Sequence, residues 1–145
     1  MLRTEKEYEG AKVQLSKFQE AYDAQVKELM DKKKLSKEQA ESSLSSTLTY
    51  GKQYMEDVEL YERLKKGDLP PSSHFSSMGR YLIAARIAKG MTQRDLAQQL
   101  NVNEASVSRD ERNEYHGVSL EKTEKILKVL GCKLEATKDK ELASV

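Results

Sequence analysis

Apolar residues in the first thirty positions have the spacing of an amphipathic helix. They recur at alternating steps of three and four, which gives a heptad seam with one polar position. Its members are Tyr8, Ala11, Leu15, Phe18, Tyr22, Gln25 and Leu29. The basic residues Lys32, Lys33 and Lys34, followed by Leu35, suit a helix C-terminus. The pattern therefore predicts one long helix that ends at this run.

A second long helix is predicted to begin at Ser36, with Gln39 as its capping-box partner. Its apolar stripe consists of Leu44, Thr47, Leu48, Gly51, Tyr54, Met55, Val58 and Tyr61. Because the two helices are of about equal length, we expect residues 1–67 to form an antiparallel helical hairpin, a dimerisation or partner-binding arm. Its buried contacts are expected to join Tyr8, Leu15, Phe18 and Tyr22 to Val58 and Tyr61.

The periodicity stops at Gly67–Ser73, which contains Pro70 and Pro71, so residues 68–76 are interpreted as a linker. Beyond it, shorter apolar patterns predict a small domain of four to five helices over residues 77–137, followed by a tail, 138–145. The helix N-caps are Thr92, Asn103 and Ser119, and helices end at Gly90 and Gly131. Residues 132–137 alternate like a short C-terminal strand, with no evident partner strand. The fold class is otherwise all-α.

The composition agrees with thin helical elements rather than one large core. Hydrophobic residues make up 37% of the 145 residues and charged residues 34%. The formal net charge is only +1, so any DNA binding must come from the local placement of charge. The charged N-terminus and the lack of a long apolar run argue against a signal peptide or a membrane partner. With Cys132 as the single cysteine, we expect a cytoplasmic protein.

Catalytic and metal-binding chemistry finds little support in the chain. His74 is expected in the linker and His116 in a loop, without neighbouring ligands at metal spacing. Cys132 has no activating base beside it in the sequence. We therefore expect no catalytic residues, no metal, no cofactor and no enzyme activity.

The informative stretch is residues 92–111, which has the pattern of two short helices joined by a tight turn. Ala97 allows two helices to cross closely, and Asn101 stands where a left-handed turn backbone is needed. Val102 and Val107 are expected to bury the inner faces of the turn and of the second helix. The second helix is predicted over residues 103–112.

The outer face of this second helix suits contact with bases. At 100° per residue, an inward Val107 places Ala105, Arg109 and Arg112 on the opposite face, flanked by Ser106 and Ser108. Small residues let a helix approach base edges, and an arginine can bind guanine O6 and N7 in bidentate fashion.

These residues resemble the Xre-type (phage-repressor and Cro-like) helix-turn-helix family over about residues 77–131. The resemblance implies that Gln93, at a helix N-terminus, touches a phosphate, and that Arg86 and Glu111 form a buried ion pair. It also implies that Glu104, Ala105, Ser106 and Arg109 face the bases. The DNA-binding residues expected in total are Gln93, Asn103, Glu104, Ala105, Ser106, Ser108, Arg109 and Arg112. Asn101 replaces a usual glycine, and Asp110 stands where an apolar residue is common.

The leading hypothesis is a sequence-specific transcriptional regulator, a repressor, that binds double-stranded DNA as a homodimer. One alternative is an antitoxin resembling the HigA-like group, which neutralises a toxin protein and represses its own operon. A second alternative is a structural adaptor whose hairpin is the working part.

Overall fold

A computed structural model describes residues 1–71 and 73–136. Ser72 of the expected linker, Thr137 of the expected strand and the tail 138–145 lie outside the described residues. The described chain is helical throughout its regular elements, so the all-α fold class is confirmed. Its helices are α1 (Glu5–Lys33), α2 (Lys37–Ser43), α3 (Ser45–Lys65), the 3-10 turn η1 (Phe75–Ser77), α4 (Met78–Ala88), α5 (Gln93–Leu100), α6 (Glu104–Arg112) and α7 (Leu120–Leu130).

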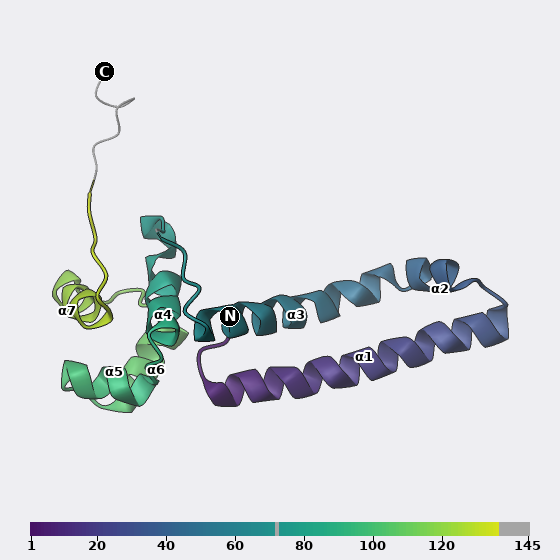
Figure 1. Cartoon of the computed structure of the whole chain (residues 1–145), viewed down its shortest axis with the longest axis horizontal. Helices are drawn as coiled ribbons and strands as arrows, with labels where there is room; N and C mark the ends of the chain where they lie inside the picture. The colour runs from purple at the N-terminus through teal and green to yellow at the C-terminus, as the bar shows by residue number, and fades with distance from the viewer. Residues whose placement is uncertain (72, 137–145) are drawn as a thin grey trace, which may run out of the picture. The chain divides into compact units, whose positions relative to one another are not determined.

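The chain divides into two compact units, Met1–Asp68 and Leu69–Val145. In the first unit, α1 runs beside α2 and α3 in the opposite direction (Figure 1). Local sequence sets the turn between them, because Lys34 ends α1 in the left-handed conformation and Ser36 caps α2. The Ser36 hydroxyl accepts from the backbone of Gln39, whose side chain accepts from the Ser36 backbone, as the capping box requires.

The return arm of the hairpin is not the single helix that the apolar stripe predicts. It is interrupted at Leu44, whose backbone leaves helical geometry at φ −102° and ψ 13°. Ala40 is fully buried there with Tyr22 and Val26, and Leu44 packs against the same cluster. Packing against α1 therefore holds the chain at the break and just before it.

The seam of α1 differs from the heptad expectation in its second half. Gln25 is exposed and Val26 is buried in its place. A straight helix drifts by about 20° per heptad, so a step of four from Tyr22 keeps the seam facing its partner. Of the four expected members nearer the N-terminus, Ala11 is buried, whereas Tyr8, Leu15 and Phe18 are half-buried.

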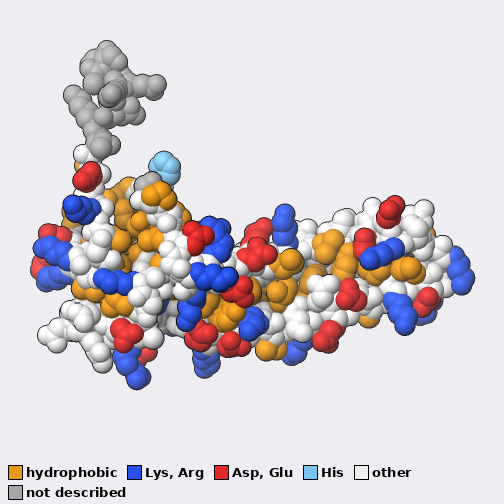
Figure 2. Space-filling view, viewed as in Figure 1, with side chains coloured by type: hydrophobic (Ala, Val, Ile, Leu, Met, Phe, Trp, Pro, Cys, Tyr) orange, Lys and Arg blue, Asp and Glu red, His pale blue; other side chains and the backbone are white. Residues whose placement is uncertain are grey.

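On α3 the stripe is only partly buried. Val58 and Tyr61 are buried as expected, whereas Leu48, Tyr54 and Met55 are 41%, 44% and 45% exposed. Figure 2 shows such hydrophobic side chains between charged ones along the hairpin. Two helices in contact cover only one narrow seam on each other, so residues that flank the seam stay in water.

The second unit has its core on α4, where every residue from Leu82 to Ile87 is buried. Helices α6 and α7 both pack against α4, and α5 packs against α6 and α7. Leu96, Val107 and Ile126 bring one nearly inaccessible side chain each from α5, α6 and α7. This small core fixes α5 and α6 to each other, which is the arrangement that the motif needs.

The expected C-terminal strand does not form in the part of it that the structure describes. Residues 132–136 follow the left-handed cap Gly131 without regular secondary structure. An isolated strand has no partner for its backbone N–H and C=O groups, and the described chain offers no second strand. The alternation of apolar and polar residues is therefore not sufficient to form a strand here.

Candidate nucleic-acid interface

The turn between α5 and α6 is built from local side-chain caps. Thr92 and Asp95 form a capping box at the start of α5, and hydrogen bonds from Thr92 hold the pKa of the Asp95 carboxyl below its ordinary value. Asn101 ends α5 in the left-handed conformation, at φ 54° and ψ 45°, as expected. Asn103 then caps α6, its Oδ1 accepting from the backbone of Ser106 at 2.7 Å. Thr92, Asn101 and Asn103 thus have the roles in this turn that the sequence predicts.

Close packing of α5 on α6 depends on Ala97 and Val107, which are 2% and 1% exposed. Val102, which was expected to bury the inner face of the turn, is instead 38% exposed. Its backbone N–H donates to the Ala97 carbonyl at 3.0 Å, so the main chain rather than the side chain anchors this turn. The turn lies at the surface of the unit, where a valine side chain finds few neighbours.

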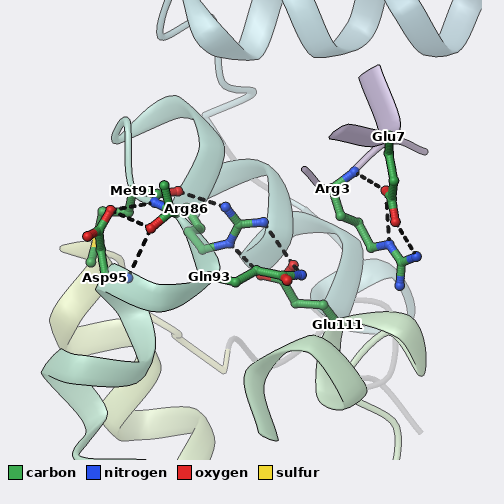
Figure 3. A network of polar contacts seen from close by, with 8 residues as sticks. Arg3, Glu7, Arg86, Met91, Gln93, Asp95 and Glu111 are labelled. Atoms are coloured by element: carbon green, nitrogen blue, oxygen red, sulfur yellow. Dashed lines mark hydrogen bonds and ion pairs between the residues drawn. The ribbon is translucent and has the colours of Figure 1, made fainter. Parts of the chain in front are cut away.

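A buried polar network joins α4, α5 and α6 (Figure 3). The Arg86 guanidinium binds Glu111 in bidentate fashion, with Nε 2.5 Å from Oε1 and Nη2 2.8 Å from Oε2. Its Nη1 also donates to the carbonyl of Met91 at 2.7 Å. Both side chains of the ion pair are almost fully buried. The network therefore fixes the angle at which α6 leaves the core.

Gln93 belongs to this network, which the sequence did not indicate. Its Nε2 donates to Glu111 Oε2 at 2.7 Å, and the residue is 9% exposed. The side-chain amide is therefore directed into the protein, in contrast to the phosphate contact that the family resemblance implied. What remains for a phosphate is the N-terminus of α5, where the backbone N–H groups of Gln93 and Arg94 have no partners within the helix. The backbone N–H of Asp95 already donates to Thr92 Oγ1.

The outward face of α6 carries Ala105, Arg109 and Arg112, all of them exposed. Ser106 and Ser108 flank this face and are half-buried. Arg109 Nε contacts the carbonyl of Ala105, one turn earlier, at 3.3 Å, so its side chain lies back along the helix toward the N-terminal end. The face therefore combines two long cations with a smooth, small-residue surface.

Six of the ten Lys and Arg side chains in residues 73–136 form ion pairs with described residues, whereas Lys89, Lys133, Arg109 and Arg112 do not. The ion pairs are Arg80–Glu114, Arg86–Glu111, Arg94–Glu104, Lys122–Asp110, Lys125–Glu121 and Lys128–Glu124. Arg109 and Arg112 have no acidic partner within 4 Å among the described residues. Lys89 instead donates to the carbonyl of Val129, at the end of α7. The outward face of α6 thus carries positive charge although the formal net charge of the chain is only +1.

Two of these ion pairs were not predicted from the sequence, and one of them involves Asp110, which departs from the family pattern. Asp110 stands where an apolar residue is common, and its Oδ2 lies 2.5 Å from Lys122 Nζ in the first turn of α7. Arg94 Nε of α5 lies 3.0 Å from Glu104 Oε2 of α6, on the other side of the turn. The partners are 12 and 10 residues apart, so no helical spacing could have indicated either pair.

Other kinds of site find no support in the described part of the chain. His74 and His116 are exposed, and over residues 1–71 and 73–136 no three His, Cys, Asp or Glu side chains gather in a way that could hold a metal ion. Within the same ranges, no helix has the length and apolar character needed to cross a membrane.

The match to known proteins is confined to this unit. Residues 82–135 match the family model of the Cro/C1-type HTH DNA-binding domain. No curated protein and no solved structure matches the chain. The match covers α5, the turn and α6, together with most of α4 and all of α7. This region is a DNA-binding helix-turn-helix domain, and the function class is DNA-binding transcription regulation.

Proposed function

We propose that this chain is a sequence-specific repressor that reads the major groove of double-stranded DNA with α6. The observation that carries the proposal is the pair Arg109 and Arg112, which have no acidic partner among residues 1–71 and 73–136 and lie beside small side chains on the outward face of α6. The buried Arg86–Glu111 ion pair holds α6 in position behind that face, so the outward side chains of α6 approach DNA in a fixed orientation.

The two arginines are assigned different roles by their places on α6. The N-terminal part of a recognition helix enters the groove, and its C-terminal end approaches the backbone. Arg109, directed toward the N-terminal end, is the base reader and binds guanine O6 and N7. Arg112 is the last residue of α6 and binds phosphate. The N-terminus of α5 adds a second phosphate contact through its backbone amides.

We further propose that the protein binds DNA as a homodimer, since a helix-turn-helix gains affinity from two symmetric half-sites. A groove of about 570 Å³ between α7 and the segment after it supports this. Its lining includes Leu120, 75% exposed, and Leu134, 46% exposed. Such exposed apolar side chains suit a contact with a second copy. Light scattering of the wild type and of Leu120→Glu tests it, because a dimer that uses this groove should dissociate in the variant.

The function is tested with operator duplexes selected from random DNA by the full chain. Arg109→Ala should lose about 1–3 kcal/mol of binding free energy on the selected site and discriminate less at one base pair per half-site. Arg112→Ala should weaken binding to selected and scrambled duplexes alike and flatten the salt dependence, because fewer counterions are released. Lys125→Ala removes one positive charge from α7 and serves as the control.

If Arg109→Ala keeps both the affinity and the base preference of the wild type, α6 is not the reader. The chain would then lose its assignment as a sequence-specific repressor.

A second candidate role, that of an antitoxin, draws on the hairpin. Leu48, Tyr50, Tyr54 and Met55 of α3 are between 41% and 78% exposed, more apolar surface than two helices need for their own seam. A toxin encoded beside this chain would bind there. Co-expression of the two proteins tests the idea: Met55→Glu should abolish co-purification of the neighbour and leave DNA affinity unchanged.

A further inference from the structure

An ion pair bridges the two helices of the motif at the point where the reading helix begins. Arg94 is the second residue of α5 and Glu104 is the first residue of α6. Arg94 Nε lies 3.0 Å from Glu104 Oε2, and their side chains are 72% and 49% exposed. The contact thus crosses the turn on the surface of the unit, next to Ala105 and Ser106 of the proposed reading face.

The geometry leaves polar atoms of both partners available. Arg94 binds the carboxylate through Nε alone, whereas a guanidinium has four further N–H donors on its two terminal nitrogens. Glu104 uses Oε2, and no hydrogen bond or ion pair to a described residue involves its Oε1. One side of the pair can therefore donate to an anion while the other side accepts a hydrogen bond.

A carboxylate on a DNA-binding face needs such a partner. Ionised Glu is repelled by phosphates, and it only accepts hydrogen bonds, so among base edges in the major groove it suits the N4 amine of cytosine. A cation that holds the carboxylate reduces the repulsion and fixes its direction. The start of a helix adds to this, because its dipole favours a negative side chain.

We propose that Arg94 and Glu104 form one specificity-determining unit of this protein. Glu104 Oε1 accepts from the N4 amine of a cytosine, and Arg94 positions that carboxylate while its terminal nitrogens donate to a neighbouring phosphate. The inference rests on the proposed function and deepens it, since it assigns a second base to the reading helix and makes Arg94 a positioning residue.

The pair differs from the other exposed ion pairs of the unit. Lys125–Glu121 and Lys128–Glu124 are i,i+4 pairs within α7, and such pairs stabilise a helix by a few tenths of a kcal/mol. Arg94–Glu104 joins two helices, and its acidic member belongs to α6. Removing it should therefore change what the protein reads rather than how stably it folds.

The test uses the full-length protein and a set of duplexes with all four base pairs at each position of its selected operator. Glu104→Gln should shift the preference at one position from cytosine to adenine, because a Gln amide matches adenine N6 and N7. Arg94→Ala should lower discrimination at that same position about tenfold and leave the position read by Arg109 unchanged. Arg94→Ala should have a smaller effect on selectivity when Glu104 is already Gln. Lys125→Ala is the charge-matched control, and melting curves verify folding.

Two outcomes would overturn the inference alone: unchanged preferences in Glu104→Gln, or a uniform loss of affinity for all duplexes in Arg94→Ala that is independent of residue 104. The second would make Arg94 a phosphate contact only. A wild-type chain that prefers no sequence, or an Arg109→Ala variant that reads DNA normally, would instead overturn the proposed function, and the inference with it.

Discussion

The amide of Gln93 and the guanidinium of Arg86 donate to the same oxygen of Glu111, Oε2, at 2.7 Å and 2.8 Å. The two donors come from α5 and α4, so the Glu111 carboxylate of α6 links three helices. Hydrogen bonds to a charged group are about twice as strong as neutral ones, and a buried charge is tolerated only when it is paired. The orientation of the reading helix therefore depends on this carboxylate.

Glu111→Ala should lower the free energy of unfolding by about 3–5 kcal/mol, because it leaves the Arg86 guanidinium buried without its counter-ion. Urea unfolding followed by circular dichroism measures the change. Glu121→Ala, which removes an exposed carboxylate from α7, is the control and should lower the free energy of unfolding by only a few tenths of a kcal/mol. Equal midpoints for the two variants would mean that the buried pair does not support the fold.

Gln93→Ala should cost about 1–3 kcal/mol of stability, since it removes one buried hydrogen bond to a charged acceptor. Gln98 is an exposed glutamine of the same helix, so Gln98→Ala controls for helix propensity. The same two variants separate the structural role of Gln93 from the phosphate contact that the family resemblance implied. A Gln93→Ala protein of normal stability but weakened DNA binding would restore the phosphate assignment.

Gly51→Ala should destabilise the hairpin by about 1 kcal/mol. A Cβ at this position would overlap the ring of Phe18 on α1. Overpacking of this kind costs about 1–3 kcal/mol, which exceeds the gain of about 1 kcal/mol from replacing glycine within a helix. Gly10 is the matched position, because a Cβ there meets nothing within 4 Å. Gly10→Ala should therefore stabilise the protein by about 0.5–1 kcal/mol in the same thermal melts.

Tyr115→Phe should raise the free energy of unfolding by about 1 kcal/mol, since a buried polar group without a partner opposes folding. Tyr115 is 8% exposed, and its hydroxyl has no hydrogen-bond partner in the described chain. Burial also raises the pKa of this phenol well above its ordinary value. Tyr50→Phe, at a position that is 78% exposed, is the control and should leave stability unchanged. Destabilisation by Tyr115→Phe would show that the hydroxyl does have a partner in solution.

The phenol of Tyr8 should lose its proton at an unusually high pH. Its hydroxyl donates to Glu62 at 2.7 Å, and this hydrogen bond, together with desolvation and the nearby charges of Glu62, Glu9 and Glu5, raises the pKa of Tyr8 from 10.0 to about 12. Because the folded-state pKa is the higher one, the stability that the bond contributes is present below pH 10 and is lost as the pH rises toward 12. NMR of ring-labelled tyrosine measures the titration. Glu62→Gln should return the pKa of Tyr8 toward 10.0, and a pKa unaffected by this change would contradict the assignment.

The sequence alone determined the parts of this protein that depend on neighbours within a few residues. Thr92, Asn103 and Ser119 cap the helices for which they were proposed, and Asn101 has the left-handed backbone that the turn needs. Each of these features is set by one side chain and the backbone three or fewer positions away, which is why the pattern sufficed. The outward direction of Arg109 followed in the same way from the helical repeat, once Val107 was placed inward.

The Arg86–Glu111 pair was expected from the family resemblance, but only the tertiary structure decided that Gln93 and Arg94 also meet acidic side chains of α6. Gln93 follows a helix cap, and nothing in the sequence near it says whether its amide turns outward or toward Glu111, 18 residues later. The Arg94–Glu104 contact likewise depends on how two helices cross. The break at Leu44 and the missing strand after Gly131 have the same cause. In each case a local pattern was compatible with more than one structure, and contacts with residues distant in the sequence, or their absence, selected one.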